Sequence, residues 1–215
     1  MERRCERDPL TESNCYLLCE AGNCVVIDPN RKELTERVAA LGLEVEHILL
    51  THEHCDHMAG LEALRQHWPA APVACTRACS RGLGSPRLNM SAMMEVYLTF
   101  RGKPGAVYPP FTCQPAEVTF SRSHTLRWRG HSLRCVPLPG HTPGSMGIFL
   151  DDAVFFSGDY LIAGQPVLLR LPGGSRADYE AATRPLLRGL SPGLEICPGH
   201  GEPYIRMKEE EEHGL

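Results

Sequence analysis

The stretch VEHILLTHEHCDH, residues 45–57, decides the fold of this chain. Its first six residues form a short apolar run of the kind that is typical of a buried strand. The rest of the stretch places His52, His54, Asp56 and His57 within six positions. Side chains alternate along an extended chain, so His52 and His54 would point the same way, while Asp56 and His57 turn toward a neighbouring point at the start of a helix. The stretch therefore predicts a metal site in which two ions share one turn.

Three later turns each offer one further candidate ligand directly after an apolar run. His141 lies in the sequence PGHTPG, Asp159 in SGD, and His200 in PGHG. Each of these sequences alone is common in turns and is weak evidence for a ligand. Together with the first stretch they supply five histidines and two aspartates. That is the number of protein ligands expected for two divalent cations held at the ends of strands.

The cysteines predict no site of their own. Ten are present, but their spacings repeat no CxxC pair of the kind that builds a structural zinc site. The N-terminus has no apolar segment behind its charges, so we expect a cytoplasmic protein whose thiols are free. Cys55 lies inside the histidine stretch, yet its side chain should point away from those of its neighbours. We therefore expect a packed thiol at Cys55.

Composition narrows the class of partner. The 215 residues carry a net charge of −4, and 42% of them are hydrophobic, as in an ordinary globular protein. The basic clusters are short and separated, which argues against nucleic acid, and no apolar window is long enough to span a membrane. We expect one domain over residues 1–215 and a small-molecule substrate. The sequence does not indicate the oligomeric state.

Apolar runs and turn residues predict a mixed pair of sheets with helices outside. The predicted elements are a hairpin over 15–28, strands over 45–50, 117–120, 131–137, 146–150 and 153–156, and helices over 32–41, 61–68 and 177–187. The acidic run Lys208–Glu212 is expected to be a solvated helix end. No internal repeat or linker is evident.

The segment Ser80–Tyr108 is the least assignable part of the chain. Its apolar residues fall on one helical face, and they are Met90, Met93, Met94, Tyr97 and Phe100. Apolar residues at this spacing usually pack into a core. Methionine also suits adaptable apolar surfaces, so the segment is alternatively a lid that selects the substrate.

The ordered set of ligands resembles the metallo-β-lactamase-fold hydrolase superfamily, and most of all its glyoxalase II-like branch. The hairpin that ends at Asp28-Pro29 is also similar to the opening strands of that family. The resemblance implies an α/β fold, a four-layer αββα sandwich with the site at one edge. It also implies a ligand set: the first metal would be held by His52, His54 and His141, the second by Asp56, His57 and His200, and Asp159 would bridge them.

The resemblance further implies a metal-dependent hydrolase of a small ester, thioester or lactone. Two divalent cations would share a water and lower its pKa, and the resulting hydroxide would be the nucleophile. Asp56 is the expected catalytic residue, because its carboxylate would accept a hydrogen bond from that hydroxide and orient it. Zinc is favoured by the mostly imidazole ligands, and iron and manganese are also compatible with such a set.

This sequence differs from the glyoxalase II-like branch at two places that affect the expected substrate. The chain ends soon after His200, so we expect no C-terminal helical domain for a glutathione moiety. Relatives often show Gly-Arg-Thr-Asp ahead of a Pro-Gly-Gly sequence, where this chain has VLLRLPGG over residues 167–174. The leucines indicate a more apolar substrate than a glutathione thioester.

Three other functions stay open at this point. A mononuclear iron sulfur dioxygenase of the same fold would use a subset of the ligands, among them His52, His54 and Asp159. A di-iron oxygen reductase would normally have Glu at the position of His54, so the histidine there argues against this function. A non-catalytic metal-binding protein would have no use for so complete a ligand set, because unpaired buried ligands are costly.

Overall fold

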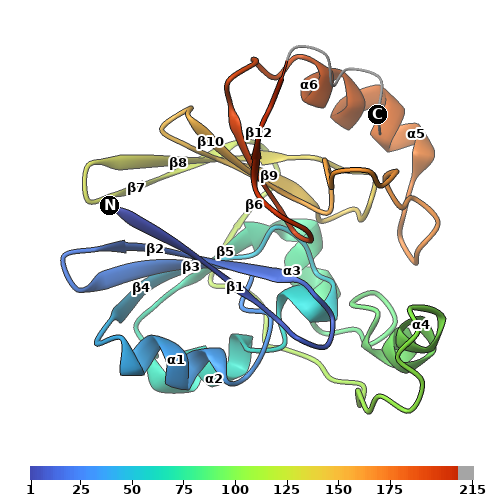
Figure 1. Cartoon of the computed structure of the whole chain (residues 1–215), viewed down its shortest axis with the longest axis horizontal. Helices are drawn as coiled ribbons and strands as arrows, with labels where there is room; N and C mark the ends of the chain where they lie inside the picture. The colour runs from blue at the N-terminus through green and yellow to red at the C-terminus, as the bar shows by residue number, and fades with distance from the viewer. Residues whose placement is uncertain (208–215) are drawn as a thin grey trace.

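Two sheets packed face to face form the centre of the molecule in the computed structural model, which describes residues 1–207 (Figure 1). The first sheet has six strands in the order β1-β2-β3-β4-β5-β6. Its strands are β1 (Glu2–Arg7), β2 (Asn14–Glu20), β3 (Asn23–Ile27), β4 (Glu44–Leu49), β5 (Val73–Thr76) and β6 (Val118–Phe120). β3 to β6 run parallel to one another, whereas β1, β2 and β3 form antiparallel pairs.

The second sheet also has six strands, in the order β12-β11-β10-β9-β8-β7. Its strands are β7 (His124–Trp128), β8 (His131–Pro137), β9 (Met146–Leu150), β10 (Val154–Gly158), β11 (Glu195–Pro198) and β12 (Tyr204–Ile205). All neighbours are antiparallel except β10 and β11, which are parallel. Consequently β8, β10 and β11 all end at the same edge of this sheet.

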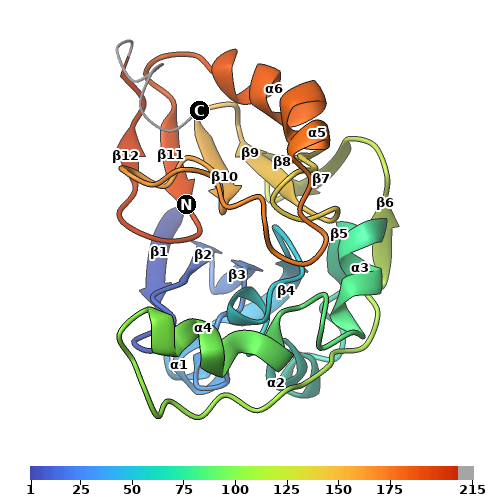
Figure 2. The same cartoon turned by 90° about the vertical axis from the view of Figure 1, so that its right-hand side faces the viewer.

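Helices cover the outer face of each sheet. On the first sheet these are α1 (Leu34–Ala40), α2 (Leu61–His67) and α3 (Arg77–Leu83). On the second sheet they are α5 (Arg176–Asp178) and α6 (Arg184–Arg188), joined by the π-helical turn η3 (Tyr179–Thr183). The helix α4 (Met94–Phe100) and the 3-10 turn η2 (Ser91–Met93) belong to the connection between α3 and β6. Helix α4 lies to one side of the stacked layers in Figure 1 and is nearest the viewer in Figure 2. The layers confirm the predicted αββα sandwich.

The core is built in layers that follow this order. Strand β9 is buried along its whole length, and Ile148 packs with residues of both sheets between them. Helix α1 turns Leu34 and Val38, four residues apart, onto the outer face of the first sheet. On the other side, Tyr179 and Leu187 pack against β10 and β11. Each sheet is therefore fixed from both faces, which holds the ends of its strands in place.

The polar turns gather at one edge because of the strand directions. In the first sheet, Asp28 follows β3 and the histidine stretch follows β4. In the second sheet, His141, Asp159 and His200 follow β8, β10 and β11. The two edges are joined directly, since the N–H of Asn14 donates to the carbonyl of Gly199 at 2.7 Å. The edge where both sheets end is the candidate site.

Most of the predicted elements form as expected. The hairpin over 15–28, the helix near 61–68 and the strands over 117–156 are present within a residue or two of the predicted limits. The helix over 177–187 is interrupted by η3. The short or polar strands β1, β5, β7, β11 and β12 and the helix α3 went unpredicted, because an edge strand such as ERRCER shows little apolar alternation.

The expected helical face over Ser80–Tyr108 is partly wrong. Met90 and Met94 are buried, but Met93 is 47% exposed and Phe100 is 86% exposed. Met90 has a φ of 66°, and η2 follows it, so the helix begins only at Met94 and the spacing is not continuous. The run Lys208–Glu212 lies outside the described residues. Within residues 1–207, none of the helices is both long and apolar enough to cross a membrane.

The packing between the sheets makes a prediction about stability. Ile148 is fully buried in β9, whereas Ile205 in β12 is 50% exposed. We expect Ile148→Ala to lower the free energy of unfolding by about 2–5 kcal/mol, because it leaves a cavity between the sheets. The matched change Ile205→Ala should lower it by less than about 1 kcal/mol. Urea unfolding followed by circular dichroism measures both, and equal losses would contradict this account of the core.

Candidate metal centre

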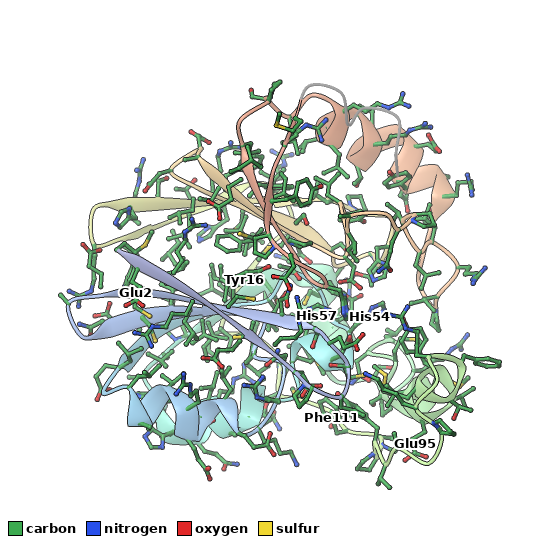
Figure 3. The ribbon with its side chains drawn as sticks, in the orientation of Figure 1. Glu2, Tyr16, His54, His57, Glu95 and Phe111 are labelled. Atoms are coloured by element: carbon green, nitrogen blue, oxygen red, sulfur yellow. The ribbon has the colours of Figure 1, made fainter. Side chains whose placement is uncertain are left out.

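The seven predicted ligands lie together at the edge where both sheets end. Their side chains form two groups, one of His52, His54, His141 and Asp159 and the other of Asp56, His57 and His200, with the ligand atoms of each group within 4.8 Å of one another. Figure 3 shows His54 and His57 at the end of the sandwich nearest α4, whereas Tyr16 lies deeper between the sheets. The fold thus joins residues that are up to 148 positions apart, from His52 to His200.

The first group presents imidazole nitrogens to one another. His54 Nδ1 lies 3.0 Å from His141 Nε2, which lies 3.4 Å from Asp159 Oδ2. The His52 ring stands 4.8 Å from the His54 ring and 5.0 Å from the His141 ring, between centroids. All three histidines are buried. The arrangement is that of ligands around a small shared space.

The second group combines carboxylates with two further imidazoles. Asp56 Oδ2 lies 3.3 Å from His200 Nε2 and 3.7 Å from His57 Nε2. Asp159 Oδ1 lies 3.2 Å from the same His57 nitrogen. The two oxygens of Asp159 therefore face different groups, Oδ2 the first and Oδ1 the second. This is the geometry expected of a carboxylate between two ions.

Several of these atoms are buried without a hydrogen-bond partner in the described part of the chain. They are Nε2 of His52, His54 and His57, and Oδ1 of Asp159, of which the last two lie 3.2 Å apart as an ion pair. A buried polar atom without a hydrogen bond lowers the free energy of unfolding by roughly 1–3 kcal/mol. Several such atoms in one place are therefore unusual unless a ligand binds there. Divalent cations would satisfy nitrogen lone pairs and carboxylate oxygens at once. The cluster fits a dinuclear metal site.

Asp28, which sequence reasoning did not single out as a site residue, orients part of the cluster. Its carboxylate accepts hydrogen bonds from the Thr51 N–H at 2.7 Å and the Thr51 hydroxyl at 2.6 Å. Asp28 Oδ2 also lies 3.2 Å from His57 Nδ1, and the Thr51 oxygen lies 3.0 Å from His52 Nδ1. Both rings therefore donate from Nδ1 and leave Nε2 to face the site. The only feature of the sequence that pointed to Asp28 was its place in an Asp-Pro pair at the end of a predicted strand.

His141 is held by groups that had no sequence signal. Its Nδ1 lies 2.8 Å from the carbonyl oxygen of Leu168, which can only accept, so Nδ1 carries the proton and Nε2 presents its lone pair to the site, 3.0 Å from His54 Nδ1. Its backbone N–H donates to the Tyr160 hydroxyl at 2.7 Å, and that hydroxyl donates to the carbonyl of Leu138. These contacts join loops far apart in the sequence.

Glu53 connects the histidine stretch to the loop that carries His141. It is buried and accepts a hydrogen bond from the Thr142 hydroxyl at 2.8 Å. A Cβ on Gly144 would lie 2.3 Å from Glu53 Oε2, so this glycine leaves room for the carboxylate. A Cβ on Gly199 would likewise lie 2.4 Å from Asp159 Oδ1. Glycine at these two positions allows the loops to close around the cluster.

The charges differ between the two groups. Burial and neighbouring histidines lower the pKa of His52 and of His141, and they lower the pKa of His54 to about 3, so these rings are neutral. Burial opposes the charge of His57, but Asp56 and Asp159 raise its pKa well above the ordinary value. In the first group, neutral rings are ready to bind a cation, whereas in the second group a cation has to displace a proton.

The carboxylates are ionised in this network. Burial acts to raise the pKa of Asp56, but His57 and His200 hold it at about 2. Burial also opposes the charge of Asp159, and the same two imidazoles keep its pKa well below the ordinary range. Anionic carboxylates are the form that binds metal.

Cys55 does not take part. It is fully buried and packs with Met90, Met94 and Leu98. Burial raises the pKa of its thiol, which removes the thiolate that a ligand or nucleophile needs. The expectation of a packed thiol is confirmed.

Comparison with curated proteins finds relatives, two of which match this chain over nearly their whole length. The chain is 27% identical to a probable metallo-hydrolase, YqgX, of Bacillus subtilis, over 94% of this chain and 91% of that protein. It is 28% identical to the hydroxyacylglutathione hydrolase GloC of Haemophilus influenzae, over 93% and 90%. Against the hydroxyacylglutathione hydrolase of Aeromonas hydrophila the identity is 30%, over 69% of this chain but 46% of that protein.

Solved structures share the fold. The BLEG-1 B3 metallo-beta-lactamase has a TM-score of 0.83 at 24% identity, covering 99% of this chain and 98% of that one. ETHE1 from Myxococcus xanthus has a TM-score of 0.73 at 22% identity, over 99% and 83%. TTHA1623, solved in a di-iron-bound form, has a TM-score of 0.68 at 26% identity, over 96% of both chains. The two likenesses below 25% identity concern the fold alone.

A family model described as the metallo-beta-lactamase superfamily matches residues 8–200, which include all seven clustered ligands. The match agrees with the paired sheets and with a metal-ligand cluster at their common edge. This chain belongs to the metallo-beta-lactamase superfamily.

Proposed function

We propose that this protein is a dinuclear zinc hydrolase that cleaves a small ester, thioester or lactone. The observation that carries the proposal is Asp159, whose two carboxylate oxygens face two separate groups of candidate ligands. The hydrolase names of the relatives support the reaction class. When bound, two divalent cations supply a Lewis acid for the substrate carbonyl and a water of lowered pKa.

Residues of the chain would bind the two cations, orient the attacking water and fix the orientation of the imidazole rings. His52, His54 and His141 would hold the first cation, Asp56, His57 and His200 the second, and Asp159 both. Asp56 also lines the cavity above the cluster, where its carboxylate can accept a hydrogen bond from the attacking water and orient it. Asp28 and Thr51 keep the His52 and His57 rings in the orientation that this work requires.

One observation favours a second candidate, the mononuclear iron sulfur dioxygenase. The three rings of the first group are neutral and stand with one carboxylate, whereas the second group is held together by its own protons. A single iron on His52, His54, His141 and Asp159 would leave the second group as an ion-pair network. The two candidates differ in metal content and in the need for oxygen.

The proposal includes the cellular compartment of the protein and the kind of molecule that it binds. All ten cysteines lie in the described residues, and all are free thiols. Free thiols in this number support a reducing compartment, the cytoplasm. A small-molecule substrate is supported by the burial of the cluster beneath a small cavity.

Metal analysis separates the two candidates. Protein purified without chelator should contain about two zinc ions per chain by mass spectrometry of the elements, because two ligand groups must be satisfied. Asp159→Ala should lower this number, and Asp152→Ala, an exposed carboxylate elsewhere, should leave it unchanged. One iron per chain, with oxygen consumption on a persulfide, would establish the dioxygenase instead.

Asp56→Ala tests the catalytic role. We expect kcat for thioester or lactone hydrolysis to fall by at least ~100-fold, because the water loses its orienting acceptor. The first group does not include Asp56, so this variant should retain at least one metal ion per chain. Turnover at the wild-type rate in this variant would refute the role of Asp56.

Asp28→Asn tests the orientation of the rings. Removing a carboxylate that fixes metal-binding imidazoles should weaken zinc binding by about 10–100-fold, measured by competition with a chromophoric chelator. Asp8→Asn is the matched control, since Asp8 is also buried and accepts from the N–H and the hydroxyl of Thr11, both at 2.7 Å. If both variants weaken zinc binding equally, Asp28 acts only through stability.

A further inference from the structure

A small cavity of about 40 Å³ lies above the cluster, between the α3–β6 connection and the loop after Asp159. Its floor is made by ligands of both groups. Its walls are five side chains from outside the cluster: Met90, Met94, Tyr97, Leu168 and Leu171. Four of the five are apolar, and the fifth offers one neutral hydroxyl. The substrate has to meet these walls when its carbonyl reaches the metals.

The first wall is a methionine pair held in a small core of its own. Met90 and Met94 are 7% and 4% exposed and pack with Cys55 and Leu98, apart from the cores of the two sheets. The left-handed backbone of Met90, with φ 66°, is unusual for a residue with a branched or long side chain. Asn89 supports it, because its amide donates to the carbonyl of Phe111 at 2.8 Å and its oxygen accepts from the N–H of Ser91 at 2.9 Å.

The second wall comes from the distant segment VLLRLPGG. Leu171 packs against the methionine core, and Leu168 lines the cavity. The Leu168 carbonyl accepts from His141 Nδ1, so this wall is fixed in position relative to a ligand of the cluster. The two apolar walls therefore meet over the site although about 80 residues separate them in the sequence.

Positive charge is missing from the walls. Among the described residues that line the cavity there is no lysine or arginine. Four cationic side chains lie near the walls in the sequence, Arg87, Arg101, Lys103 and Arg170, but none of them lines the cavity. Arg101 and Lys103 face Glu12, at 3.9 Å and 3.2 Å, and Lys103 also donates to the carbonyl of Leu10. A carboxylate on the acyl group would thus be buried against thioethers and leucines with no cationic side chain in the walls to pair with, which is unfavourable.

We propose that this pocket selects short apolar acyl groups that carry no charge, and that Met94 and its neighbours Met90 and Leu171 are the residues that select them. The inference rests on the proposed hydrolase function and names its substrate class, an uncharged short-chain acyl thioester or ester. In the reaction the bond between the acyl carbon and the sulfur or oxygen breaks. Water supplies a hydroxyl to the acyl carbon and a proton to the leaving thiol or alcohol. Methionine side chains adapt to chains of different length, which suits a range of a few carbons.

Paired substrates measure the selection. Butyryl and succinyl thioesters of N-acetylcysteamine have acyl chains of equal carbon number and differ in the terminal carboxylate. The wild-type protein, loaded with zinc, should favour the butyryl thioester in kcat/KM by at least ~100-fold, because only the succinyl group brings an unpaired charge into the pocket. A ratio near one would overturn the inference.

Two neighbouring methionines provide the variant and its control. Met94→Lys places a cation in the wall and should reduce the butyryl preference at least ~10-fold, whereas Met93→Lys, at a site 47% exposed, should leave it unchanged. Met94→Ala, which cannot add a charge, should instead shift the preferred acyl chain from butyryl toward octanoyl. If the Met93 variant shifts the ratio as far as the Met94 variant, or if neither Met94 variant shifts its preference, the pocket does not select the acyl group.

A binding experiment is independent of turnover. The seven methionines can be labelled with carbon-13 at their methyl groups and assigned by single Met→Leu variants. Butyrate should shift the methyl signals of Met90 and Met94 and leave that of Met93 in place, and succinate should shift none of them. Absence of any butyrate shift at Met90 and Met94 would contradict the apolar pocket.

The two experiments separate this inference from the function on which it rests. If no thioester, ester or lactone is hydrolysed while butyrate still shifts Met90 and Met94, the hydrolase proposal is wrong and the apolar pocket is supported. If thioesters are hydrolysed with no preference between butyryl and succinyl, the hydrolase proposal holds and the selection is wrong.

Discussion

Imidazoles and carboxylates buried without sufficient partners are the constraint around which this molecule is organised. Nε2 of His52 has no hydrogen-bond partner within the described residues, and Nε2 of His57 and Oδ1 of Asp159 have only an ion pair with each other and with neighbouring charges, although a folded protein normally hydrogen-bonds such atoms. Asp28, Thr51 and the Leu168 carbonyl hold the opposite side of three rings, so their Nε2 atoms converge on the site instead of turning to solvent. These contacts orient the rings toward the space that a cation would occupy.

The packing of the two sheets is what creates the cluster. The first sheet contributes the histidine stretch after β4, and the second contributes His141, Asp159 and His200 from three strand ends. Neither sheet alone holds a complete second group, since Asp56 and His57 come from one and His200 from the other. The buried layer that includes Ile148 therefore fixes the distances in the site as well as the stability of the fold.

The wall above the cluster shows where local patterns fail. The spacing of Met90, Met93, Met94 and Phe100 is that of a single helical face, but the left-handed turn at Met90 divides it. Consequently Met94 enters the cavity while Met93 and Phe100 face solvent. Leu171 was visible in the sequence as a departure from relatives, yet its contact with the methionine core depends on a loop that crosses between layers. Periodicity describes one segment, whereas a pocket is made by several.

The sequence by itself determined the ligand types, their order and the strand-then-turn setting of each, because a polar residue in a tight turn after an apolar run is a local property. It also indicated the paired sheets, since apolar runs of strand length alternate with amphipathic helices. Only the tertiary structure decided which ring nitrogen faces the site, that Asp159 spans both groups, that Asp28 and Glu53 hold the loops, and that uncharged walls cover the ligand cluster. These depend on hydrogen bonds and contacts between residues far apart in the chain, which a local pattern does not contain.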